Sequence, residues 1–389
     1  MRYAAKRLDR VPPYPFAIIG QKVRELKAAG HDVIRLDMGS PDLPPPQPVI
    51  DKLSESANTS SHHGYAGFVG LPALRKAFAD YYKRRFDVDL DPDAEVLPLI
   101  GSKEGIVNMA LAQVDAGDVV LCPSPGYPAY KMGTIYAGGE PYFMPLKAEN
   151  GFLPDLDAIP ADVLDKARMI WVNYPNNPTG AVATLEDYQR ILDFCTEHDI
   201  LICSDNPYAD VAWEGERPPS MLELTNARDR VVEFTSLSKL YNMAGWRVGA
   251  CVGNPDMVGA LRVVKSNIDS GLFRGIQDAS ICALDETSEA WVADRNEVYR
   301  RRRDILIEAM PRIGLSAEPT KASLYVWAAV NGGDDAGYAA EALQNAHVSI
   351  APGAAFGEAG QGFVRISMIV PEERMKEAVD RLADWHAKR

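Results

Sequence analysis

Short apolar runs recur through the middle of the chain, and each is followed by a polar turn and a segment with helical spacing. They lie at Val119–Cys122, Met169–Asn173, Ile200–Ser204, Val231–Thr235 and Arg247–Val252. Continuous apolar runs of this length are typical of strands in a sheet that is buried on both faces. Because the runs alternate with helical segments, we expect an α/β fold with a mostly parallel central sheet.

Segments with other patterns flank this central block. The apolar residues of Phe16–Ala29 share one helical face, and Gly30 follows them as a stop signal. The proline-rich segment Pro41–Pro48 cannot form a helix interior, so we expect it to be extended. Further helices are expected at Leu71–Phe86, Glu289–Met310 and Glu372–Ala387, and further strands at Val33–Asp37, Leu324–Ala329 and Phe363–Ser367.

This succession predicts two domains, which is the number that 389 residues favour. Residues 45–285 would form the large domain around the parallel sheet. Residues 286–389, which mix long helices with strands, would form a smaller α+β domain together with an N-terminal arm in residues 1–44.

The charge balance and the cysteines narrow the function classes. A net charge of −13 repels phosphate backbones and anionic lipids, so no nucleic-acid or membrane role is expected. No leader peptide or long apolar span is recognisable. The odd cysteine count has no paired spacing, and Cys122, Cys203 and Cys251 lie in strand-like runs, where we expect buried thiols. These features favour a cytoplasmic enzyme.

Two conspicuous polar runs carry no chemistry in this interpretation. Arg300–Arg303 lies on an expected long helix, where we expect a solvated or intersubunit face. The pair His62 and His63 lacks a further ligand at metal spacing, so no metal site is expected.

Polar clusters follow the expected strands, at the edge of a parallel sheet where sites usually form. They are Gly101–Gly105, Pro125–Tyr127, Asn176–Gly180, Asp205–Tyr208 and Ser236–Lys239, with Arg247 shortly after. Together these residue types suit a pyridine aldehyde that bears a phosphate. Lys239 supplies an amine for a Schiff base with the aldehyde, and Asp205 supplies a carboxylate for a protonated ring nitrogen.

The other parts of such a ligand also find partners. The phosphate needs hydroxyls, cations and a helix start, which Ser102, Lys103, Ser236, Ser238 and Arg247 offer. Tyr208 and Asn177 can donate to the ring oxygen, and Tyr127 can stack on the ring face.

The segments LDMGSPDLPPP, GYAGFVGLPALR, GSKEG, PSPGYP, NYPNNPTG, SDNPYADV, SLSKLYNMAGWRVG and FVRIS occur in this order. In them the chain resembles, over nearly its whole length, the class I/II aminotransferases of pyridoxal-phosphate (PLP) fold type I. The resemblance implies PLP as cofactor and the roles given above for the cluster residues. It further implies that Tyr65 reaches the phosphate of a neighbouring subunit in a homodimer. Arg365 would bind the substrate α-carboxylate, with Gly39 beside it. Tyr14, in PPYPF, would either contact the substrate or only hold the N-terminal arm in place.

The resemblance implies transfer of an amino group between an L-amino acid and a 2-oxo acid, such as 2-oxoglutarate or pyruvate. The segments GSKEGIVN and KSNIDSGLFRGIQDA look like the branch of LL-diaminopimelate and alanine aminotransferases. A PLP-dependent carbon–sulfur lyase, or an alanine-releasing decarboxylase, is the alternative on the same residues. A transcription regulator is not expected, because the match leaves no room for a DNA-binding module. The group that selects the substrate side chain stays open, with the candidates Lys265, Asn267, Asp269, Ser270 and Arg274.

Overall fold

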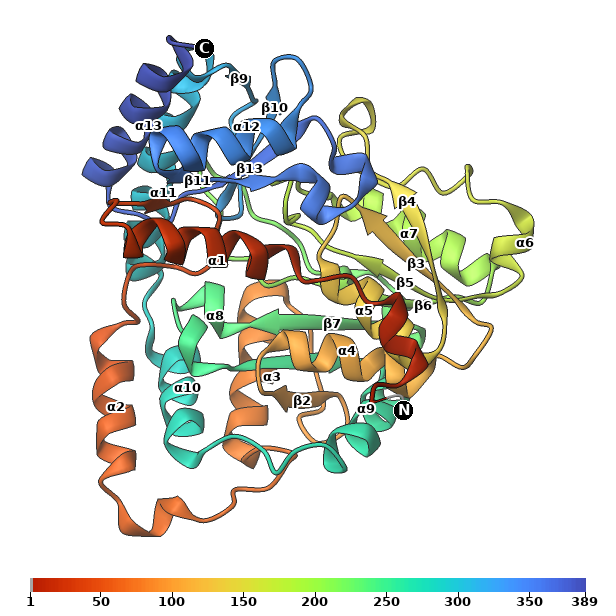
Figure 1. The fold of residues 1–389 in the computed structure, drawn as a ribbon. Coiled ribbons are helices and arrows are strands. Elements are labelled where there is room, and N and C mark those ends of the chain that lie inside the picture. Colours follow the sequence, from red (N-terminus) through yellow and green to blue (C-terminus); the bar gives the residue numbers. More distant parts are fainter. Residues whose placement is uncertain (1–2) are drawn as a thin grey trace.

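The computed structural model describes residues 3–389, and its centre is a seven-stranded sheet (Figure 1). In spatial order the strands are β2 (Val96–Leu99), β8 (Gly249–Gly253), β7 (Val231–Ser236), β6 (Leu201–Asp205), β5 (Ala167–Val172), β3 (Val119–Ser124) and β4 (Glu140–Pro145). Strand β8 is antiparallel to both of its neighbours, and the remaining pairs are parallel. The expected α/β fold with a mostly parallel sheet is confirmed.

All five strands expected from apolar runs are present, but β8 begins two residues late. Arg247 has a φ of 59°, in the left-handed region, so it belongs to a turn rather than to the expected strand. Strands β2 and β4, the two edges of the sheet, were not expected from the apolar pattern. Both contain proline, which lacks a backbone donor and is tolerated at edges.

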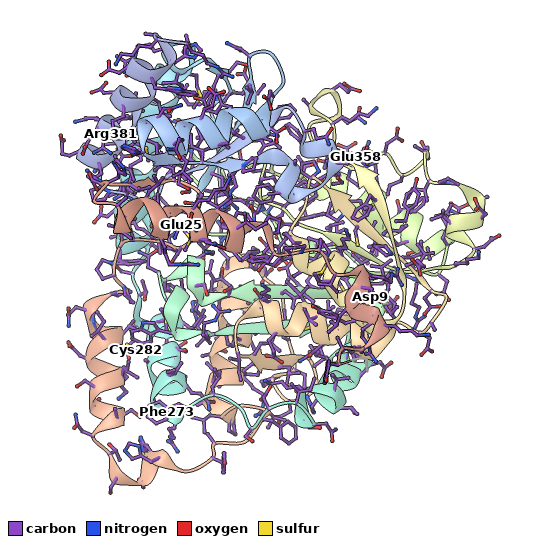
Figure 2. The ribbon with its side chains drawn as sticks, in the orientation of Figure 1. Asp9, Glu25, Phe273, Cys282, Glu358 and Arg381 are labelled. Atoms are coloured by element: carbon purple, nitrogen blue, oxygen red, sulfur yellow. The ribbon has the colours of Figure 1, made fainter. Side chains whose placement is uncertain are left out.

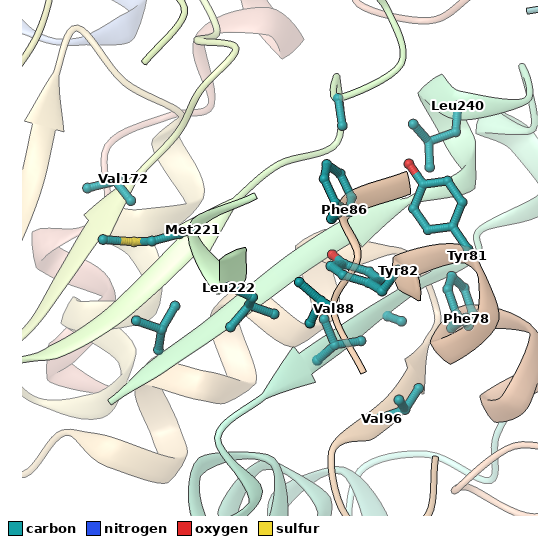
Figure 3. Packing of buried hydrophobic residues seen from close by; sticks show 14 of the residues in the cluster. Phe78, Tyr81, Tyr82, Phe86, Val88, Val96, Val172, Met221, Leu222 and Leu240 are labelled. Atoms are coloured by element: carbon teal, nitrogen blue, oxygen red, sulfur yellow. The ribbon is translucent and has the colours of Figure 1, made fainter. Parts of the chain in front are cut away.

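Helices cover both faces of the large sheet. One layer contains α3 (Pro72–Phe86), α7 (Leu185–Glu197) and α10 (Arg274–Glu286), and the opposite layer contains α4 (Ser102–Gln113), α5 (Pro128–Ala137) and α9 (Pro255–Ser266). Neighbouring strand residues alternate between the two cores: Ile170 packs with the first layer and Trp171 with the second. Figure 3 shows part of the first core, with Phe78 and Tyr82 of α3 facing the sheet.

A second, antiparallel sheet has the order β12 (Ala351–Pro352), β13 (Phe363–Ser367), β10 (Tyr325–Val330) and β9 (Leu315–Ser316). Its core includes residues of α11 (Glu289–Ala309), α12 (Asp335–Glu341) and α13 (Glu372–His386). Strand β1 (Ile34–Arg35) pairs in parallel with β11 (Val348–Ser349), so the start of the chain is tied to its last third.

Helix α1 (Pro15–Ala28) crosses the molecule between the two sheets, where Figure 2 labels Glu25 (Figures 1 and 2). The remaining helices are α2 (Gln47–Ala57), α6 (Ala161–Leu164) and α8 (Leu237–Leu240). The extended segment expected at Pro41–Pro48 is therefore too long. Gln47 and Pro48 form the first turn of α2, a position where the missing N–H of proline costs little.

The prediction of a solvated or intersubunit face at Arg300–Arg303 is wrong for two of its residues. Arg302 and Arg303 are each only 3% exposed. Arg302 donates to both carboxylate oxygens of Asp42, at 2.7 and 3.0 Å, and the guanidinium of Arg303 lies 5.6 Å from the ring of Trp213. Arginine can be buried on such a helix because its charge is paired and its planar head stacks.

The five cysteines are buried free thiols, which confirms the expectation for Cys122, Cys203 and Cys251. Within residues 3–389, no helix has both the length and the apolar character that a membrane crossing needs. The same residues contain no cluster of three or more His, Cys, Asp or Glu side chains suited to a metal ion.

Candidate active site

A cavity of about 640 Å³ is lined by residues at the carboxyl ends of central strands, by residues of α1 and by residues of the smaller sheet. Nearly all the candidate residues line it: Tyr14, Gly39, Ser102, Lys103, Tyr127, Asn177, Asp205, Tyr208, Ser236, Ser238, Lys239, Arg247 and Arg365. Tyr65 does not, and its side chain is 93% exposed. The fold therefore brings together segments from β1 to β13 around one space.

Asp205 is the last residue of strand β6, and only one of its two carboxylate oxygens accepts a hydrogen bond. Its Oδ2 accepts a hydrogen bond of 2.6 Å from the Tyr130 hydroxyl, while its buried Oδ1 has no hydrogen-bond partner in the described part of the chain. Burial raises the pKa of the carboxyl to about 7, against the lowering effect of the Tyr130 bond. An unpartnered buried acceptor needs a donor, which a protonated pyridine nitrogen supplies.

Lys239 lies in the short helix α8 that follows β7, and its amine points into the same cavity. Its Nζ donates to the carbonyl oxygen of Gly39. Burial, reinforced by the charges of Arg365 and Arg247, lowers the pKa of the amine to about 7. A substantial fraction of the amine is therefore neutral near pH 7, as a nucleophile or proton acceptor requires.

The start of α4, the turn after β7 and the arginine before β8 form an anion cradle. Ser102 and Lys103 open α4, where free backbone N–H groups favour anions. Arg247 donates to the Ala244 carbonyl at 2.9 Å, and more weakly to Ser238 Oγ at 3.5 Å. Gly101 has a φ of 74°, and a Cβ there would collide with the Arg247 guanidinium. These residues fit the phosphate of PLP.

Arg365 in β13 carries a buried charge that lacks a carboxylate partner among residues 3–389. Its guanidinium donates to Asn177 Oδ1 at 2.9 Å and to the Asp37 carbonyl at 2.6 Å, and its Nε has no partner. It is only 4% exposed and lies 4.2 Å from the ring of Tyr325. A buried cation of this kind is completed by an anion, and a planar carboxylate fits its fork of donors.

Tyrosines and a lysine complete the lining. The Tyr208 and Tyr325 hydroxyls lie 2.9 Å apart, and burial raises the pKa of Tyr208 well above its ordinary value. Lys103 Nζ lies 4.9 Å from the ring of Tyr14 and 5.9 Å from that of Tyr127. Burial and the nearby Arg247 lower the Lys103 pKa.

Sequence reasoning missed three polar residues that hold the candidates in place. Tyr130 bonds Asp205, Tyr325 bonds Tyr208, and Asn173 donates to the Asp205 carbonyl at 2.6 Å. Asn173 stands at the end of an expected strand, as Asp205 does, so its position was a usable signal. Tyr130 lies in the first turn of α5, three residues after the capping residue Tyr127, and this spacing also indicated a position near the site. Tyr325 gave no such signal.

The candidates for side-chain selection lie outside this cavity. Lys265 is only 1% exposed, and its Nζ pairs with Asp269 at 2.7 Å and Glu104 at 3.4 Å. Asn267, Ser270 and Arg274 are likewise absent from the cavity wall of this chain.

Comparisons with known proteins agree with this geometry. Residues 31–382 match the family model of the class I and II aminotransferases. The LL-diaminopimelate aminotransferase of Aquifex aeolicus (strain VF5) is 48% identical over 97% of each chain, and that of Moorella thermoacetica is 48% identical over 97% of each. Among solved structures, substrate-bound BacF from Bacillus subtilis has a TM-score of 0.94 and 35% identity, and covers 99% of this chain and 98% of its own.

The chain therefore belongs to the class I and II aminotransferases. It is a PLP-dependent transaminase of fold type I, which moves an amino group between an amino acid and a 2-oxo acid. The lyase alternative is not favoured, since these relatives are aminotransferases.

Proposed function

We propose that this enzyme is an LL-diaminopimelate aminotransferase, which takes an amino group from LL-diaminopimelate and passes it to 2-oxoglutarate or pyruvate. The support for this substrate is the similarity to relatives of that name along almost the entire chain. The observation that carries the chemistry is the single cavity that contains both the unpartnered Asp205 oxygen and the amine of Lys239.

The proposed roles follow the position of each group. PLP, when bound, supplies an electron sink that weakens the bonds at the substrate α-carbon. Lys239 would hold it covalently through Nζ, and Asp205 Oδ1 would accept from its ring nitrogen. Tyr208 and Asn177, which line the cavity, would donate to the ring oxygen, and Tyr127 would stack on the ring. Ser102, Lys103, Ser236, Ser238 and Arg247 would hold the phosphate.

On the substrate side, Arg365 binds the α-carboxylate, with Gly39 and Tyr14 at the same end of the cavity. A Cβ at Gly39 would collide with the Tyr325 hydroxyl, so only glycine leaves this approach open. Once the substrate amine has displaced it, the Lys239 amine would take the proton from the substrate α-carbon and deliver it to the cofactor carbon that Nζ had held. A pKa near 7 suits both directions of this transfer.

We also propose that the enzyme is a cytoplasmic homodimer in which Tyr65 bonds the phosphate of the neighbouring subunit. The exposed position of Tyr65, away from the cavity of its own chain, supports this arrangement. The proposed domains are residues 45–285, and residues 1–44 with 286–389; residues 1–2 lie outside the described chain. The pairing of β1 with β11 supports the union of the two ends.

Absorption spectra of the PLP-loaded enzyme test the proposal. LL-diaminopimelate, L-glutamate, L-alanine and L-aspartate are added separately, and the visible band of the bound cofactor is followed. We expect LL-diaminopimelate to convert the band, and the matching 2-oxo acid to restore it. Conversion by other donors but not by LL-diaminopimelate would refute the proposed substrate while leaving the enzyme class intact.

A further inference from the structure

Beyond Arg365, two arginines of the cavity wall have no ion pair within residues 3–389: Arg247, which belongs to the anion cradle, and Arg24. Arg24 of α1 lines the cavity, and its guanidinium has no hydrogen-bond or ion-pair partner within residues 3–389. The neighbouring Arg35 differs, because it donates to both oxygens of Asp37, at 3.0 and 2.6 Å. Of these two arginines, Arg35 is therefore paired with a carboxylate and Arg24 is not.

The direction of the Arg24 side chain follows from helix geometry. Phe16, Gly20 and Arg24 are spaced four residues apart, so they share one face of α1, and all three line the cavity. The Nη1 of Arg24 lies 3.5 Å from where a Cβ on Gly20 would stand. The Arg24 side chain thus lies over Gly20, toward the start of the helix. Because glycine has no side chain, the Arg24 guanidinium has room there.

The face of α1 that carries Phe16, Gly20 and Arg24 also borders the expected α-carboxylate site at Arg365. The Phe16 ring lies 5.4 Å from the guanidinium carbon of Arg365. Gly20 is one helical turn further along α1, roughly 5.4 Å along the axis. A short chain held at one end by Arg365 can therefore reach the guanidinium above Gly20 with its other end.

The remaining cations of the cavity have other neighbours. Arg247 and Lys103 belong to the cradle at the start of α4, and Lys239 is the proposed amine. Arg24 belongs to neither group: it lies on α1, and its side chain is exposed to solvent.

We propose that Arg24 binds the distal carboxylate of dicarboxylic substrates, so that the enzyme prefers amino and oxo acids with a carboxylate at each end. The inference rests on the proposed function, in which Arg365 takes the α-carboxylate. It names the residue that selects the substrate side chain, which the sequence alone left open, and it places this residue on α1 of the same chain.

Calorimetry on the PLP-loaded enzyme tests this without turnover. The probes are glutarate, with two carboxylates, and butyrate, with one. In Arg24→Gln we expect the affinity for glutarate to fall roughly tenfold, the value of a charged hydrogen bond at the weak end of its range, and the affinity for butyrate to stay unchanged. Arg24→Lys should restore part of the loss. Lys22→Gln removes a charge from the same helix outside the cavity and should behave as wild type.

Turnover gives the second readout. The kcat/KM for 2-oxoglutarate should fall in Arg24→Gln by a similar factor, while that for pyruvate stays within twofold or so. Equal losses for both acceptors, or an unchanged glutarate affinity, would overturn the role of Arg24. If the wild type transaminated no donor while its glutarate affinity still depended on Arg24, the proposed function would fail and this inference would stand.

Discussion

At the scale of single residues, burial raises the pKa of an acid, Asp205, and lowers the pKa of a base, Lys239, until the two values are similar. The carboxyl of Asp205 and the amine of Lys239 both have a pKa of about 7. The hydrogen bond from Tyr130 opposes this shift at Asp205, because it stabilises the charged carboxylate. The Tyr130 hydrogen bond therefore favours the ionised form of Asp205 that its proposed partner needs.

Replacing Tyr130 by phenylalanine should raise the pKa of Asp205 further, since the stabilising donor is lost. We expect kcat to fall about tenfold at neutral pH, as for one charged hydrogen bond, and the acidic limb of the pH profile to move to higher pH. The phenylalanine ring can keep the stacking on Trp171 at 4.8 Å, so folding should survive. Tyr136→Phe, on the same helix α5, is the control. An unshifted acidic limb would contradict the role of Tyr130.

The raised pKa of Asp205 also predicts how stability depends on pH. Without PLP, the folded carboxyl has a pKa of about 7 and the unfolded one about 3.8. The folded state binds the proton more tightly, so stability falls as pH rises from 3.8 to 7. Asp205→Asn should thus raise the melting temperature of the PLP-free protein above pH 7, and change it little near pH 4.

In the PLP-loaded protein the same substitution should have the opposite effect, because a neutral amide cannot match the charge of a protonated ring nitrogen. Melting curves with and without PLP, at both pH values, check the two signs together. If the PLP-free variant melted at a lower temperature than the wild type at high pH, the buried Asp205 carboxylate would not destabilise the PLP-free protein, and the prediction would be wrong.

At the scale of elements, the long helix α11 holds the turn that carries Lys239. Arg295 of α11 is buried, and it donates to the carbonyl oxygens of Lys239, Leu240 and Asp210. Arg295→Met removes the arginine donor from the Lys239 and Leu240 carbonyls, while the Asp210 carbonyl keeps the Asn296 side chain at 2.9 Å, and we expect a cost of about 2–4 kcal/mol of unfolding free energy. Urea unfolding measures the loss. Arg301→Met, at an exposed position of the same helix, should cost no more than about 1 kcal/mol.

Apolar patterning predicted the central strands because they are buried on both faces and their runs are uninterrupted. It missed β2 and β4 because an edge strand pairs on one side only and tolerates the prolines that both contain. It also assigned Arg302 to a solvated or intersubunit face, since the sequence does not show that Asp42 lies beside it. A local sequence pattern cannot predict which residues from distant parts of the chain will lie side by side.

The same limit applies to the site. The sequence placed the polar groups at strand ends correctly, because the topology of a parallel sheet gathers those ends. Tyr325 and Arg24 were missed because they reach the cavity from the smaller sheet and from α1. Their approach depends on how these elements pack over the large sheet, which no local spacing reveals.

At the scale of the whole molecule, the proposed dimer makes Tyr65 act on the site of the other subunit. Its side chain is 93% exposed, so Tyr65→Phe should leave the protomer fold unchanged and lower the affinity for PLP about tenfold, through the loss of one hydrogen bond to a charged group. PLP titration followed by the cofactor band measures this loss.

A mixed dimer decides which subunit Tyr65 serves. One subunit carries Tyr65→Phe and the other carries Lys239→Ala, which removes the proposed base. If Tyr65 serves the neighbouring site, both defects fall on the site of the Lys239→Ala subunit, and the other site is complete. At PLP concentrations that leave the Tyr65→Phe homodimer mostly unloaded, the mixed dimer should then bind PLP tightly at one site and be active there. If Tyr65 serves its own site, each site of the mixed dimer carries one defect, and neither is both tight and active.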